Sequence, residues 1–225
     1  MAKLLSNLQT QLQDIYALQM THCVNDFLIQ DSHLVNCLDN SDNTRELPEK
    51  LLIRQQGDNV DLALYLDPEL VGRLEQSDPT RLLHDDNIYD FWIALEGISH
   101  FLYVIYNVKY ERGVSLFELE LQAEVDKYIL AALLVGQQRD GNVPASLHYH
   151  LFRNVRFDER LNDDELHRYR SANELASRFC SYLETSLKQG VPLNMLFNPL
   201  RRFYRLGHHH KVRAIASLGK QAVNL

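Results

Sequence analysis

The pattern of hydrophobic and polar positions along the chain predicts a mainly α-helical protein with an irregular arrangement of helices and one β-hairpin. Apolar residues recur at a spacing of three to four through most of the chain. Glycine and proline are scarce, at 9 and 6 of 225 residues, which also favours helix. We expect helices over residues 3–22, 24–38, 68–74, 88–108, 116–134, 144–154, 163–187, 199–206 and 209–218.

One stretch, residues 51–67, alternates with a period of two and predicts the hairpin. Gly57-Asp58-Asn59 supplies the turn. The second strand has one apolar and one largely polar face, and the apolar positions are Val60, Leu62, Leu64 and Leu66. Because an isolated hairpin is marginally stable in water, we expect it to pack on the helices or to pair with another strand, which a second subunit could supply.

A polar segment at residues 39–44, followed by Pro48, is the clearest boundary in the chain. It divides an N-terminal helical segment, residues 1–38, from a main helical domain, residues 48–225. The main domain holds the hairpin and the basic C-terminal helices. The same pattern is compatible with a single domain, because no long linker or internal repeat separates the parts.

The chain has a net charge of −7, and its charged residues are distributed unevenly along the sequence. From Thr185 to the end the chain has seven basic and no acidic residues, so the preceding part carries −14. A basic segment of this kind can bind an acidic partner, nucleic acid included, or fold against its own acidic body. We favour the second interpretation. The candidate partner-binding residues are Arg201, Arg202, Arg205, Lys211 and Arg213.

Cysteine usage and the N-terminus indicate a soluble cytoplasmic protein. Cys23, Cys37 and Cys180 are odd in number and widely spaced, which favours neither a disulfide framework nor a zinc knuckle. The first residues lack the apolar run of a signal peptide. The most apolar stretch, residues 101–108, is too short to cross a bilayer, so we expect no membrane partner.

The helix expected at residues 88–108 is apolar on most sides but carries a polar stripe. Glu96, His100, Tyr103 and Asn107 fall within about 60° of one another on a helical wheel. If this helix packs antiparallel to the helix at 116–134, Glu96 and His100 face Glu120 and Glu124, which are then four candidate catalytic residues.

Histidine and carboxylates are ligands for iron, manganese and zinc, and they also transfer protons. The spacing Glu-x-x-x-His occurs once here, however, whereas di-metal bundles repeat Glu-x-x-His on two helices. Buried hydrogen bonding is therefore the favoured interpretation of the stripe, and we expect no metal and no cofactor.

Strong catalytic motifs are missing from the sequence. It contains no GxSxG, GxGxxG, GxxxxGK[ST] or HExxH. The leading hypothesis is therefore a cytoplasmic helical interaction protein, an adaptor, regulator or complex subunit whose partner is another protein or a second copy. The alternatives are a metal-dependent or acid/base enzyme that uses the four candidate residues, and a nucleic-acid-associated protein that uses the basic C-terminal segment.

Overall fold

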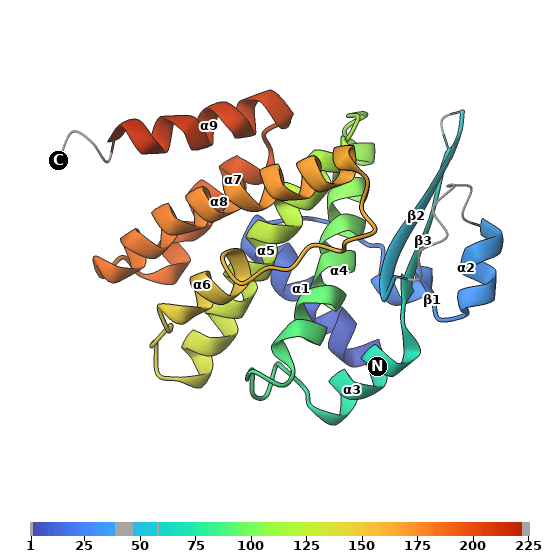
Figure 1. Ribbon diagram of the computed structural model, residues 1–225, viewed down its shortest axis with the longest axis horizontal. Coiled ribbons are helices and arrows are strands. Elements are labelled where there is room, and N and C mark those ends of the chain that lie inside the picture. The colour runs from blue at the N-terminus through green and yellow to red at the C-terminus, as the bar shows by residue number, and fades with distance from the viewer. Residues whose placement is uncertain (1, 39–46, 58, 222–225) are drawn as a thin grey trace. The chain divides into compact units, whose positions relative to one another are not determined.

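The computed structural model describes residues 2–38, 47–57 and 59–221, and it is mainly helical with one small sheet (Figure 1). The predicted fold class is therefore confirmed. The described chain divides into two compact units. The N-terminal unit comprises Met1–Gln13 and Leu18–Gly113, and the C-terminal unit comprises Asp14–Ala17 and Val114–Leu225. The polar boundary expected at residues 39–44 lies outside the described residues.

The N-terminal unit contains a mixture of helices and short strands. Its elements are α1 (Ala2–Tyr16), η1 (Val24–Phe27), β1 (Leu28–Ile29), α2 (Ser32–Leu38), β2 (Glu49–Gln56), β3 (Asn59–Leu66), α3 (Pro68–Gln76) and α4 (Ile88–Lys109). Because Asp67 accepts hydrogen bonds from Glu69 N and Leu70 N, α3 begins at Pro68 as the sequence predicts.

The first predicted helix is too long. Instead of continuing to residue 22, α1 ends at Tyr16, where Ala17 takes a left-handed conformation with φ of 50°. The amide of Leu18 then bonds to the carbonyl of Gln13 at 2.8 Å, which closes the helix end. Alanine is an unusual residue in this conformation, so no residue at this position signals the end of the helix. The second predicted helix, residues 24–38, is divided into η1, β1 and α2.

The three described strands form one sheet in the order β1–β3–β2. The antiparallel β2–β3 hairpin pairs Glu49 with Leu66 and continues to Gln56 and Asn59. The short β1 lies parallel to β3, pairing Leu28 with Leu64. The hairpin thus obtains a third strand from its own chain. Both β2 and β3 contact α4, so the hairpin also packs on a helix, as expected.

Helix α4 forms the core of the N-terminal unit and lies beside the hairpin (Figure 1). In the described part of the chain it is the one helix with the length and apolar composition of a membrane span, and 78% of its most apolar window is buried. Its burial is that of a core helix, as its apolar circumference predicts.

The C-terminal unit contains, besides the end of α1, a set of helices. These are α5 (Leu116–Gln138), α6 (Ser146–Phe152), α7 (Asp163–Lys188), η2 (Leu193–Leu196), α8 (Phe197–Tyr204) and α9 (His208–Gln221). Helix α7 packs on α5, α6 and α9. A capping box formed by Ser115 and Glu118 begins α5.

Candidate metal centre on α4 and β2

The sheet packs closely against α4 at Gly97. A Cβ atom at this position would lie 2.7 Å from Leu64 Cδ1 and 2.9 Å from both Cγ and Oε1 of Glu49. These separations are shorter than any normal contact, so a side chain at this position would force Leu64 and Glu49 to move. As a consequence, the Glu49 carboxylate lies directly against the helix backbone.

Three potential metal ligands converge beside this contact. Glu96 and His100 lie one turn apart on α4, and Glu49 reaches them from the first position of β2. One ligand atom from each of the three residues lies within 4.8 Å of the other two. Glu49 Oε1 and His100 Nδ1 are 3.8 Å apart, which is longer than a hydrogen bond.

The cluster is largely withdrawn from solvent. The side chains of His100 and Glu49 are 9% and 11% exposed, and Glu96 is half-buried. Two carboxylates at such separations repel each other, and burial makes the repulsion stronger than in water. Positive charge at the cluster therefore lowers its energy.

The separations suit a coordinated ion after small side-chain movements. Zinc binds histidine nitrogen and carboxylate oxygen at about 2.0–2.2 Å, which places two ligand atoms of a tetrahedral site about 3.4 Å apart. The Glu49–His100 separation of 3.8 Å needs little adjustment to reach that value. Three protein ligands leave at least one coordination position for water or a substrate atom.

The sequence prediction found two of these three residues and missed Glu49. A signal for Glu49 was present in the alternation of β2, where Glu49, Leu51 and Ile53 share one face. The register pairs Glu49 with Leu66 and Leu51 with Leu64, so Glu49 lies on the mostly apolar face of the hairpin. A carboxylate on that face is the kind of buried polar group that needs a partner.

The other half of the polar stripe, Tyr103 and Asn107, is buried within α4. Tyr103 and Asn107 are 1% and 3% exposed. The Asn107 side-chain amide donates to the carbonyl oxygen of Tyr103 at 2.7 Å. Hydrogen bonding within the helix therefore accounts for Asn107, in agreement with the favoured interpretation for this part of the stripe.

Glu120 and Glu124 belong to α5 in the C-terminal unit. Glu120 is 9% exposed. The Lys127 ammonium donates to Glu124 Oε1 at 2.5 Å and forms an ion pair with it. The predicted meeting of these glutamates with Glu96 and His100 stays a prediction.

The five candidate partner-binding cations differ in their surroundings. Arg201 donates to the carbonyls of Ile15 at 2.8 Å and Asp14 at 3.0 Å, and Arg205 donates to the carbonyl of Tyr16 at 3.0 Å. These two guanidinium groups satisfy the last carbonyls of α1, where a positive charge is favourable.

The remaining three cations comprise two exposed residues and a buried lysine. Arg202 and Arg213 are exposed, whereas Lys211 is fully buried. The ammonium of Lys211 donates to Gln122 Oε1 and lies 4.6 Å from the ring centroid of Phe203. Lys211 is therefore part of the interior and does not contribute to an exposed basic surface.

Lys211 belongs to a buried polar network in the C-terminal unit. Gln122 donates to Asp126 at 2.8 Å and to the Tyr16 hydroxyl at 3.1 Å, and Tyr16 donates to Asp126. Burial, together with the nearby Asp126 charge, raises the pKa of Tyr16 well above its ordinary value. Tyr16 thus stays neutral and acts as a donor, and the network has the character of a fully connected structural core.

Among the candidate residues, the Glu49–Glu96–His100 cluster has the composition and separations of a metal site. The predicted cations at Arg201, Arg205 and Lys211 bond to the protein's own groups. Comparison of the chain with protein-family models, with curated proteins and with solved structures found no match.

Proposed function

We propose that this protein binds one divalent first-row metal ion through Glu49, Glu96 and His100, and that the ion keeps a position open for water or substrate. The observation that carries the proposal is the convergence of three ligand atoms within 4.8 Å on two packed elements. A helix and a strand hold ligands more precisely than loops do.

The donor set narrows the choice of ion. Imidazole suits zinc and iron, and carboxylate oxygens suit manganese. One imidazole with two carboxylates therefore favours Zn²⁺, Fe²⁺ or Mn²⁺ over Mg²⁺, which prefers oxygen ligands and retains several waters. An ion in such a site lowers the pKa of bound water and polarises a substrate oxygen. The proposed class is a metal-dependent protein of the catalytic type.

Metal titration of the protein tests the proposal. Protein purified without an affinity tag is stripped with a chelator, and Zn²⁺ and Mn²⁺ are titrated in separate calorimetric experiments. We expect one ion per chain. Since loss of a group that only orients a ligand costs 10–100-fold in affinity, loss of a ligand itself in Glu49→Gln or His100→Ala should cost at least about 100-fold.

Two matched controls make the titration specific. Glu120→Gln removes a sequence-predicted carboxylate on α5 and should leave the affinity unchanged. Three consecutive histidines, His208 to His210, could bind metal ions at the surface. A variant with alanine at the exposed His209 and His210 tests whether these side chains contribute to the measured metal binding. Absence of stoichiometric binding, or an equal loss in Glu49→Gln and Glu120→Gln, contradicts the proposed ligand set.

The interaction-protein hypothesis stays a prediction, and one of its supports has changed. The hypothesis rested partly on a hairpin that could pair with a strand of a second subunit. In the structure β3 pairs with β1 of the same chain, so this support is weaker. Nucleic-acid association also stays a prediction. Two of its five cations, Arg202 and Arg213, have exposed side chains that an acidic partner could reach.

A further inference from the structure

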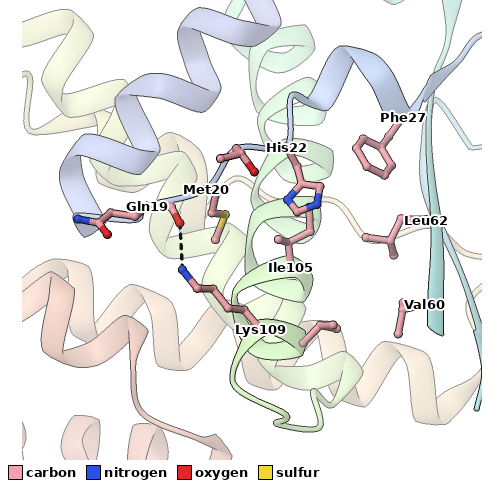
Figure 2. Close-up of a pocket in the computed structure, with 10 residues that line it drawn as sticks. Gln19, Met20, His22, Phe27, Val60, Leu62, Ile105 and Lys109 are labelled. Atoms are coloured by element: carbon pink, nitrogen blue, oxygen red, sulfur yellow. Dashed lines mark hydrogen bonds between the residues drawn. The ribbon is translucent and has the colours of Figure 1, made fainter. Parts of the chain in front are cut away.

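A cavity of about 450 Å³ opens between the loop after α1, the start of β3 and the end of α4 (Figure 2). Its volume lies within the range of about 300–1,000 Å³ that is typical of small-molecule sites. All the lining residues belong to the N-terminal unit. They are Gln19, Met20, Thr21, His22, Phe27, Val60, Leu62, Ile105, Val108 and Lys109.

The wall of this cavity is apolar. Val60 and Leu62 come from the face of β3 that also carries Leu64, which contacts Gly97 of α4. Ile105 supplies the facing surface from the helix, and Phe27 closes one side (Figure 2). These side chains suit an aliphatic or aromatic group, because such a group loses contact with water when it enters.

The rim of the cavity has positive character. Lys109 lies in the last turn of α4, and its ammonium donates to the carbonyl oxygen of Gln19 at 3.2 Å (Figure 2). An ammonium has three donors, so it can bind an anion in addition. His22 adds an exposed imidazole, and none of the ten lining residues is acidic. A carboxylate fits this rim by charge.

We infer that the cavity binds an aliphatic carboxylate of medium chain length, with its tail against Leu62 and Ile105 and its head group at Lys109 and His22. At about 30 Å³ for a group the size of a water molecule, the volume admits on the order of ten to fifteen non-hydrogen atoms. Decanoate has this size. The inference goes beyond the metal proposal and does not depend on it.

Calorimetric titration with decanoate and with 1-decanol, both below the concentrations at which they aggregate, tests the inference. The two probes share a tail and differ in charge. We expect decanoate to bind the wild-type protein about fivefold or more tightly than decanol, because a charge-assisted hydrogen bond to Lys109 adds to the apolar contact. Lys109→Met should reduce decanoate affinity to that of decanol and leave decanol affinity unchanged.

A second variant, Leu62→Trp, fills the cavity and should abolish binding of both probes. Lys188→Met removes an exposed cation in the C-terminal unit and should change neither affinity. Melting curves of each variant show whether it is folded. Equal binding of decanoate by wild type and Lys109→Met, binding that persists in folded Leu62→Trp, or no binding by the wild type would each overturn the inference. Glu49→Gln should bind decanoate normally, which separates this result from the outcome of the metal titration.

Discussion

Replacing Gly97 by alanine is the most direct test of the packing that creates the candidate metal centre. The new Cβ atom would lie 2.7 Å from Leu64 Cδ1 and 2.9 Å from Glu49 Cγ, so the buried Leu64 and the Glu49 side chain must move. Overpacking of this kind costs about 1–3 kcal/mol. Alanine is also a better helix former than glycine, by about 0.8–1.0 kcal/mol. The net expectation is a destabilisation of about 0–2 kcal/mol.

Gly72→Ala provides a matched control that isolates the contact. Gly72 lies inside α3, and a Cβ atom there would meet nothing within 4 Å. This variant should therefore gain only the helix preference and become about 0.5–1 kcal/mol more stable. The difference between the two variants, about 1–3 kcal/mol, is then the cost of the contact at Gly97.

Urea unfolding measures both variants, with the free energy of unfolding extrapolated to zero denaturant. The metal titration adds a second readout, because displacement of the Glu49 carboxylate should weaken the metal affinity of Gly97→Ala but not that of Gly72→Ala. If both variants are stabilised equally and bind metal equally, β2 does not cross α4 at Gly97 and the proposed centre is not formed.

Two further predictions concern the C-terminal unit. Lys211→Met should destabilise the protein by about 3–5 kcal/mol in urea unfolding, because it leaves the buried Asp126–Gln122 network without its cation. The control variant Lys188→Met, at an exposed position, should change the free energy of unfolding by less than about 1 kcal/mol. Equal effects of the two substitutions would contradict the burial of Lys211. Burial raises the pKa of Tyr16 and Cys180 above their ordinary values of 10.0 and 9.0. At high pH the folded state therefore keeps protons that the unfolded state releases. The free energy of unfolding should fall above about pH 9, by about 1.4 kcal/mol per pH unit for each group that ionises in the unfolded state. A free energy of unfolding that is the same at pH 8 and pH 10.5 would refute this prediction.

Local patterns in the sequence were sufficient to predict most of the helices and the hairpin. The spacing of apolar residues predicted a helix at residues 88–108, and α4 spans Ile88–Lys109. The alternation at residues 51–67 predicted the hairpin that β2 and β3 form. These elements were predictable because periodicity and turn residues act between neighbours in the chain. The end of α1 was not predictable, because Ala17 carries no turn signal and adopts a positive φ all the same.

The candidate site was only half predictable from the sequence. Glu96 and His100 share a helix face, so their spacing alone brings them together. Glu49 is distant from both in the chain, and its approach depends on the register of β2 against β3 and on the missing side chain at Gly97. The alternation of β2 indicates which face Glu49 occupies, but a local pattern does not show which helix that face meets.

The sequence by itself determined most of the helical and extended segments, which of their faces are apolar and where charge accumulates. Tertiary structure decided what each polar group meets. Lys211 lies in a basic segment and is nevertheless buried beside Gln122, whereas Arg202 in the same segment is exposed. The physical reason is that helix and strand preferences are set by neighbouring residues, whereas burial and pairing of charges depend on contacts between segments that are far apart in the chain.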